Sequence, residues 1–311
     1  MKNKKWIALA AAVVLAVTAL PMTVFAAKKD KEEEKLSKVT LNEVAHSIFY
    51  APQYVAIEEG YFAEEGLDLT LVTGFGADKT MTAVISGEAD IGFMGAEASV
   101  YAYQEGATDP VVNFAQLTQR AGNFLVAREE MPDFKWEDLK GKKVLGGRKG
   151  GMPEMVFEYI LKKNGIDPQK DLTIDQSIDF GSTAAAFTGD DSAAYTVEFE
   201  PSATILEKEG GGYVVASLGE ASGYVPYTSY SAKVSYMEEN PEIIQKFTNA
   251  LQKGMNYVQV HTPEEIAEVI APQFKETDIE TITTIVKRYY DQDTWKENLI
   301  FEKDSFELLQ D

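Results

Sequence analysis

Several segments that follow predicted strands carry side chains suited to holding a small molecule. In open α/β sheets, the loops that leave the carboxyl ends of the strands line the binding cleft. The first such segment begins at His46, which together with Ser47 could hydrogen-bond to a ligand. Phe49 or Tyr50 could stack on a flat ring. The alternative interpretation is that Phe49 belongs to the core and that the protein itself satisfies His46.

Two further segments are rich in small residues, and each precedes a predicted helix. Free backbone amides at a helix start suit a carboxylate, sulfonate or phosphate group. The alternative is that the glycines only form a turn, with Asp78 as the N-cap. Glu97, in the first turn of the helix predicted after Gly95 and Ala96, would complement the helix dipole, which is a structural role. The predicted ligand contacts in these two segments are Phe75, Gly76, Ala77, Gly95 and Ala96.

The glycine-rich segment 146–153 holds two cations and opens a helix in the second half of the chain. Arg148 or Lys149 could pair with an anionic ligand, or both could remain solvated. The segment lacks the Lys-Ser/Thr ending of a phosphate-binding P-loop, so nucleotide hydrolysis is not indicated. Together with Gly150, the two cations are the predicted contacts here.

Glu200 follows another predicted strand, and a carboxylate in the cleft would suit a ligand with an amino or amidine-like group. Tyr195 and Phe199 could add aromatic walls beside it. Tyr227 belongs to a tyrosine cluster where the chain is expected to cross back, and it could line the cleft or pack the hinge.

The residue inventory argues against catalysis. The chain has no Cys and only two His, so thiol catalysis, a Cys-ligated zinc site and a histidine-based metal site are not expected. No nucleophile, base and orienting group stand together in the sequence. Two acidic residues could act as in a glycosidase, but nothing in the sequence sets their separation. We therefore expect no catalytic residues, no metal ligands and no cofactor.

Short apolar runs alternate with helical segments from about residue 39, which is typical of an α/β protein. Two α/β units are followed by a part that is helical from Pro241 to the end of the chain. This order predicts a discontinuous first lobe, residues 39–127 plus 230–311, and a second lobe, residues 128–229, with two crossing strands as the hinge. A cleft between two such lobes suits a ligand that is engulfed and released.

The first 26 residues have the pattern of a secretory signal peptide: three lysines, an apolar run, and small residues before a cleavage site. Residues 27–38 are charged and predict a flexible linker. Removing the three lysines takes the formal charge from -21 to -24, which repels phosphate backbones, so no nucleic-acid partner is expected. The protein is predicted to be exported, to the periplasm or the cell surface.

Four motifs occur in a characteristic order: His46–Leu69 with its Ala-Pro, Gly-Tyr-Phe and Glu-Gly-Leu-Asp elements, then Ser86–Gly92, Trp136–Lys142 and Glu200-Pro201. With them the chain resembles ABC-transporter solute-binding proteins of the family whose members take up sulfonates, nitrate and thiamine-pyrimidine precursors. The resemblance covers roughly residues 40–300. It implies the type II periplasmic binding-protein fold and, by the Glu-Pro match, a ligand contact at Glu200. It also implies an enzyme branch with a cysteine cluster, which this chain lacks.

The resemblance implies that the protein binds a small molecule, works as a monomer and delivers its ligand to an ABC permease in the membrane. The aromatic loops and Glu200 favour a heterocycle such as a thiamine-pyrimidine precursor. Gly76, Arg148 and Lys149 favour instead a sulfonate or nitrate. A secreted enzyme of pyrimidine metabolism is the third alternative, against which the missing cysteines argue.

Overall fold

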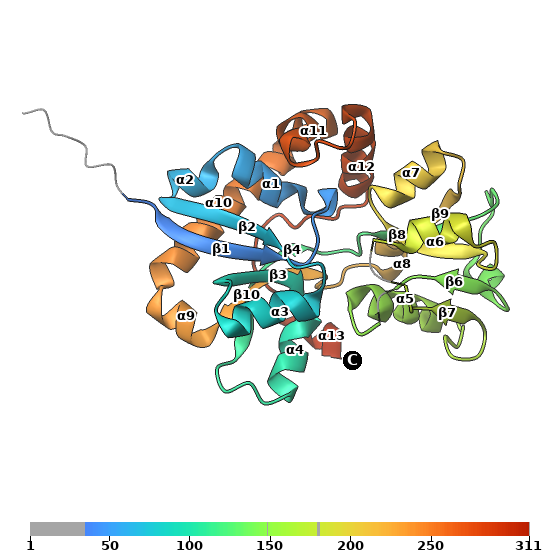
Figure 1. Cartoon of the computed structure of the whole chain (residues 1–311), viewed down its shortest axis with the longest axis horizontal. Helices are drawn as coiled ribbons and strands as arrows, with labels where there is room; N and C mark the ends of the chain where they lie inside the picture. Colours follow the sequence, from blue (N-terminus) through green and yellow to red (C-terminus); the bar gives the residue numbers. More distant parts are fainter. Residues whose placement is uncertain (1–34, 148, 179–180, 311) are drawn as a thin grey trace, which may run out of the picture. The chain divides into compact units, whose positions relative to one another are not determined.

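Residues 35–147, 149–178 and 181–310 are described by the computed structural model. Their strands form two five-stranded sheets with helices packed around them (Figure 1). This is the α/β class predicted from the alternating pattern. The expected signal peptide, most of the expected linker and Arg148 lie outside the described residues.

The first sheet has the strand order β2-β1-β3-β10-β4. Strand β1 pairs in parallel with β2 and β3, whereas β10 runs antiparallel to β3 and β4. In β2 the leucines alternate with exposed Asp68 and Thr70, as expected for a strand with one covered face. The bounds are β1 Ser37–Glu43, β2 Leu67–Thr73, β3 Ile91–Gly95, β4 Val111–Thr118 and β10 Thr228–Lys233.

The first strand begins before the expected end of the linker. Ser37 and Lys38 already pair with Leu67 and Asp68 of β2, and the amide of Ser37 donates to the carbonyl of Gly66 at 2.9 Å. Lys38 occupies a strand position whose side chain points to solvent, which accommodates its charge. The charged residues in this range led to the prediction of a linker, so the strand was predicted to start two residues too late.

The second sheet has the order β7-β6-β8-β5-β9, with β6 parallel to β7 and β8, and β5 antiparallel to β8 and β9. Strand β5 lies within the range 39–127 expected for the first lobe, but its backbone pairs only with strands of the second sheet. The first crossing between sheets therefore precedes Asn123. The bounds are β5 Asn123–Ala127, β6 Lys143–Leu145, β7 Thr173–Asp175, β8 Tyr195–Phe199 and β9 Tyr213–Ser217.

Each sheet has one antiparallel strand in fourth place, β10 in the first and β5 in the second. Each of these strands follows directly on a crossing from the other sheet, at residues 119–122 and 223–227. The strands of the first sheet thus come from two parts of the sequence, one before and one after the strands of the second sheet. Two chain segments connect the sheets at these points.

Helices cover both sheets, and their apolar faces explain their positions (Figure 1). In α10 the buried residues recur at helical spacing, from Phe247 through Leu251 to Val258, and this face packs against α1. The helices accompanying the first sheet are η1 Ile48–Tyr50, α1 Ala51–Glu58, α2 Tyr61–Glu64, α3 Ala77–Ser86, α4 Glu97–Gln104, α9 Val234–Glu239, α10 Pro241–Val260, α11 Pro263–Ile270, η3 Ala271–Gln273, α12 Ile279–Asp291 and α13 Lys303–Gln310. Those of the second sheet are η2 Trp136–Leu139, α5 Met152–Lys163, α6 Thr183–Gly189, α7 Ser202–Lys208 and α8 Leu218–Ser222.

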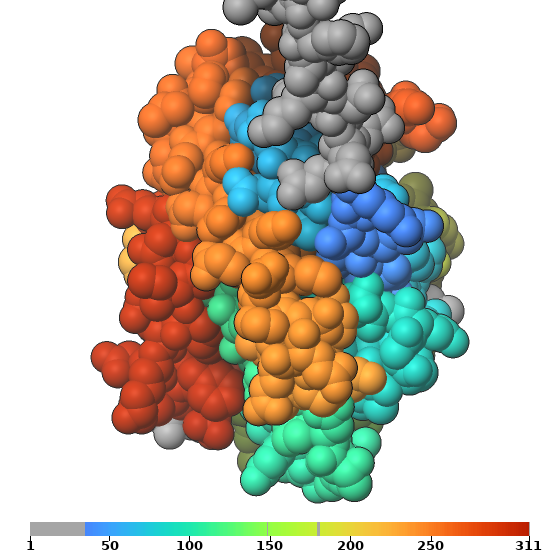
Figure 2. Space-filling model, turned by 90° about the vertical axis from the view of Figure 1, so that its left-hand side faces the viewer, coloured from blue at the N-terminus to red at the C-terminus, as the bar shows by residue number. Residues whose placement is uncertain are grey.

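The C-terminal part is not helical throughout, contrary to the prediction. After α12 the chain runs extended beside β4, where Trp295 bridges Thr118 and the amide of Gln116 donates to the carbonyl of Leu299 at 3.0 Å. Figure 2 shows this red segment next to the orange α9–α10 segment, where Gln252 donates to the carbonyl of Glu297. No helix in the described part of the chain has both the length and the apolarity to cross a bilayer.

Candidate ligand-binding site

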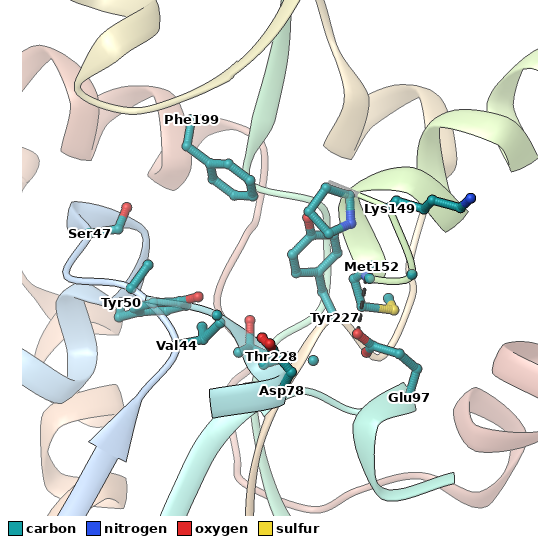
Figure 3. A pocket seen from close by; sticks show the side chains of 17 residues that line it. Val44, Ser47, Tyr50, Asp78, Glu97, Lys149, Met152, Phe199, Tyr227 and Thr228 are labelled. Atoms are coloured by element: carbon teal, nitrogen blue, oxygen red, sulfur yellow. Dashed lines mark hydrogen bonds between the residues drawn. The ribbon is translucent and has the colours of Figure 1, made fainter. Parts of the chain in front are cut away.

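A cavity of about 130 Å³ lies between the two sheets. One wall is built by the ends of β1 and β3 and the start of α3. The opposite wall is built by residues 149–153 at the start of α5 and by Phe199 at the end of β8. Figure 3 shows Tyr50, Phe199 and Tyr227 around the hollow, with Glu97 and Met152 at one side. Loops at strand ends thus converge on one space, as the topology predicts.

A second cavity, of about 320 Å³, adjoins the first and shares Ala45, Ser47, Pro153 and Phe199 with it. Its further walls come from the start of β5, the glycines after β6 and the end of β8. The two cavities are therefore neighbouring parts of one cleft. Its size is in the range of small-molecule sites.

Most of the predicted contacts meet at this cleft. From the first sheet, the first cavity is lined by Ser47, Tyr50, Gly76, Ala77 and Gly95. From the other side it is lined by Lys149, Gly150, Phe199 and Tyr227. The second cavity adds His46, Phe75 and Glu200. Phe75 has a positive φ of 56° and is 66% exposed, so its ring stands at the rim.

Phe49, Ala96 and Tyr195 line neither cavity. Phe49 is fully buried, its ring contacts those of Tyr227 and Tyr289, and its carbonyl accepts a hydrogen bond from Trp295 at 2.9 Å. Phe49 is therefore a core residue, which was the alternative to its predicted role in stacking on a ligand. Ala96 is fully buried before α4, and the hydroxyl of Tyr195 points to the sulfur of Met131 at 3.3 Å.

His46 is held by the protein at both ring nitrogens. Nδ1 lies 2.8 Å from Glu43 Oε1, and Nε2 lies 2.9 Å from the carbonyl oxygen of Gln273. The bond to Glu43 raises the pKa of His46, because both neighbours accept from the protonated ring. His46 borders the cleft, but its hydrogen-bonding capacity is used within the protein.

Glu200, the expected anchor for an amino group, is likewise engaged. Its carboxylate accepts from the amide and hydroxyl of Thr204, each at 2.9 Å, and forms an ion pair with Arg288 of α12 at 2.9 Å. The residue is 2% exposed. Glu200 therefore fixes the start of α7 and joins it to α12, with its carboxylate turned to those partners.

Two other buried carboxyls border the cleft and were not among the predicted contacts. Burial raises the pKa of Glu97, at the first cavity, to about 7. Burial also raises the pKa of Glu198, at the second cavity, to about 7, although the hydroxyls of Thr196 and Thr183 donate to it. The sequence signal was an acidic residue at or just after the carboxyl end of a strand.

Tyr50 and Tyr227 form aromatic walls of the cleft, and their hydroxyl groups stay protonated. Burial raises the pKa of both hydroxyls above the ordinary value for tyrosine. The Tyr227 hydroxyl lies 3.5 Å from Asn123 Oδ1 at the start of β5. Among the described residues, no group of three or more His, Asp or Glu side chains could hold a metal ion. The described lining thus offers stacking surfaces and a few polar atoms.

Comparison with known proteins identifies the family. The family model described as "NMT1/THI5 like" matches residues 48–266. The chain belongs to this family. It is 48% identical over 286 residues to YtlA of Bacillus subtilis, named as a candidate binding protein, covering 92% of this chain and 85% of that one.

More distant relatives of the chain are named for a ligand or a reaction. The riboflavin-binding protein RibY of Chloroflexus aurantiacus is 25% identical, covering 74% of this chain and 65% of that one. The formylaminopyrimidine-binding protein of Halalkalibacterium halodurans is 23% identical over 76% of this chain and 72% of its own. A 4-amino-5-hydroxymethyl-2-methylpyrimidine phosphate synthase of Aspergillus parasiticus is 24% identical over 68% of this chain and 63% of its own.

Solved structures confirm the fold of this family member. The alkanesulfonate-binding protein SsuA of Xanthomonas axonopodis superposes with a TM-score of 0.70 at 14% identity, covering 89% of this chain and 91% of that one. The periplasmic nitrate-binding protein NrtA of Synechocystis has a TM-score of 0.67 at 17% identity, covering 81% and 70%. The chain therefore has the periplasmic binding-protein fold that the motifs predicted.

Proposed function

We propose that the protein is the extracytoplasmic receptor of an ABC importer and captures a small organic nutrient by closure of two lobes. The first lobe is formed by the first sheet and its helices, and the second by the residues between the two crossings. The observation that carries the proposal is a cleft whose walls come from both sheets. A ligand that contacts both walls stabilises the closed form over the open one. The closed form of the monomer then docks on the membrane permease.

Within this role, an uncharged heterocycle such as a thiamine-pyrimidine precursor is the ligand we favour. Tyr50, Phe199 and Tyr227 give the first cavity aromatic walls on which a flat ring can stack. The names of two relatives, for riboflavin and formylaminopyrimidine, support the same class. The role assigned to Glu200 changes, since its carboxylate is occupied by Arg288 and Thr204.

A sulfonate or nitrate receptor is the second candidate. Lys149 and the residues around Gly76 line the first cavity, and two superposing structures are named for alkanesulfonate and nitrate. An enzyme of pyrimidine metabolism is the third, because the similarity extends to pyrimidine phosphate synthases. We favour a receptor over an enzyme because the relative YtlA, at 48% identity, is named as a binding protein, whereas the synthase is only 24% identical.

Binding and closure test the proposal together. The chain from residue 27 is screened by calorimetry against formylaminopyrimidine, riboflavin, ethanesulfonate and nitrate, and X-ray scattering is recorded with any compound that binds. We expect saturable binding of one ring compound, recovered unchanged, with a smaller radius of gyration. Conversion of the compound to a product would instead favour the enzyme.

A pair of aromatic variants ties binding to the cleft. Phe199→Ala removes a ring that borders both cavities, and we expect it to weaken binding at least tenfold. Tyr213→Ala is the control, because this exposed tyrosine of β9 borders neither cavity. Equal losses in both variants, or no binding and no compaction with any compound, would rule out the receptor role.

A further inference from the structure

Glu97 joins the two walls of the first cavity. Glu97 is the first residue of α4, beside the first sheet. Its Oε1 accepts a hydrogen bond of 3.1 Å from the amide of Met152, at the start of α5. Figure 3 shows this contact as a dashed line, with the carboxyl turned toward Met152 and Tyr227. A carboxyl oxygen of the protein thus already occupies the helix start where a bound anion would be held.

The other carboxyl oxygen, Oε2, is buried and has no hydrogen-bond partner among the described residues. Glu97 as a whole is 3% exposed, so bulk water does not satisfy this atom. Gly95 leaves room for the Glu97 carboxyl, since a Cβ at Gly95 would clash with both carboxyl oxygens and would stand 2.6 Å from Oε1. A buried acceptor without a donor costs free energy, which a donor group of a ligand would recover.

A complementary atom borders the second cavity. Asn123 is fully buried at the start of β5, and its Nδ2 has no acceptor among the described residues. Among the described residues that line the cleft, Glu97 thus has a buried acceptor and Asn123 a buried donor without a hydrogen-bond partner. A ligand that carries an N–H group and a ring nitrogen or carbonyl would satisfy both.

The charges around the first cavity disfavour an anion. Its described lining has two carboxyls, Asp78 and Glu97, and one ammonium, Lys149. Figure 3 shows the nitrogen of Lys149 directed away from Glu97 and Tyr227. An anion next to Glu97 would add a second negative charge where burial already disfavours the first.

We propose that Glu97 and Asn123 determine specificity: Glu97 accepts an N–H from an uncharged or cationic ligand and excludes anions from the start of α5, while Asn123 donates to an acceptor of the same ligand. The inference rests on the proposed receptor function and narrows its ligand class. By this inference, the carboxyl of Glu97 is the group that favours a heterocycle as the ligand and disfavours a sulfonate or nitrate.

The test uses small probes that need no knowledge of the natural ligand. Heteronuclear NMR follows the chain from residue 27 at pH 8 during titration with 4-aminopyrimidine, nitrate and ethanesulfonate. We expect 4-aminopyrimidine alone to shift the amides of Met152 and its neighbours. The variant Glu97→Gln keeps the acceptor for Met152 but removes the charge. The Kd of this variant for 4-aminopyrimidine should be about tenfold higher or more. Asn123→Ala should raise the Kd in the same direction.

Glu105→Gln is the matched control, because Glu105 is exposed at the end of α4, the helix that Glu97 starts, and borders neither cavity. It should bind 4-aminopyrimidine as the wild type does. Nitrate or ethanesulfonate binding to the wild type at Met152, or a Kd for 4-aminopyrimidine that Glu97→Gln leaves unchanged, would overturn the inference. Absence of 4-aminopyrimidine binding would overturn it too. None of these results depends on nutrient capture and lobe closure, which scattering and calorimetry test separately.

Discussion

The carboxyl of Glu97 should make the stability of the protein depend on pH in a way that one substitution removes. Burial raises its pKa from 4.5 to about 7, although its own backbone and the amide of Met152 favour the charged form. Below pH 4.5 the group is protonated in both the folded and the unfolded chain. Between pH 4.5 and 7 the unfolded chain releases the proton while the folded chain keeps it, so stability falls as pH rises.

The size of this effect follows from the shift. At about 1.4 kcal/mol per pKa unit, a carboxyl raised from 4.5 to about 7 lowers the free energy of unfolding by about 3 kcal/mol at pH 8. Glu97→Gln is uncharged at every pH and avoids this loss. The variant should match the wild type near pH 4.5 and exceed it by about 3 kcal/mol at pH 8.

Urea unfolding followed by circular dichroism at pH 4.5, 6, 7 and 8 measures this difference, with Glu105→Gln at the other end of α4 as the control. Glu198 also titrates with a pKa of about 7, but it contributes equally to both proteins and cancels in the comparison. A constant difference between Glu97→Gln and the wild type over this pH range would refute the assignment of a buried, destabilised carboxylate.

Three further substitutions or titrations follow from contacts around the cleft. Arg288→Ala should lower the free energy of unfolding by about 3 kcal/mol in urea, because it leaves buried Glu200 without its cation; a change below about 1 kcal/mol would contradict the pairing. Gly95→Ala should keep the fold but displace the Glu97 carboxyl, so its affinity for 4-aminopyrimidine should fall at least tenfold in the same NMR titration; unchanged affinity would exclude Glu97 from the site. His46 should titrate by NMR with a midpoint above 6.5, so that its stabilising contribution is complete below pH 6.5 and disappears as pH rises through that midpoint; a midpoint at or below 6.5 would argue against its bond to Glu43.

The sequence predicted the fold class well because the apolar periods are strong. Leu67, Leu69 and Leu71 alternate in β2, and α10 has a clear apolar face. The crossing before Asn123 was placed too late because two strand-like runs, 111–118 and 123–127, follow each other closely. Which sheet a strand joins depends on backbone pairing with distant residues, and neighbouring side chains do not encode this.

The site was predicted at the level of loops and less well at the level of side chains. Strand ends and helix starts could be located, so Ser47, Gly76 and Phe199 were expected near the cleft and line it. The direction of a side chain depends on long-range partners. Glu200 turns to Arg288, which lies 88 residues away in the chain, while Glu97 turns to Met152, 55 residues away. A local motif shows neither partner.

The contacts between the two sheets bear on the proposed closure of the two lobes. At the cleft these contacts are few and weak: the hydroxyl of Ser47 reaches the carbonyl of Glu200 at 3.2 Å, and Glu97 reaches the amide of Met152. Beside the cleft, Arg288 of α12 forms ion pairs with Glu200 and with Glu207 of α7, so that one cation faces two carboxylates. In the proposed closure, a ligand that adds its own hydrogen bonds beside these two weak contacts stabilises the closed form, whereas the α12–α7 pairs need no ligand to form. Ligand contacts to Ser47 and Glu97 should therefore set the affinity, and the pairs of Arg288 should set how readily the unliganded lobes close.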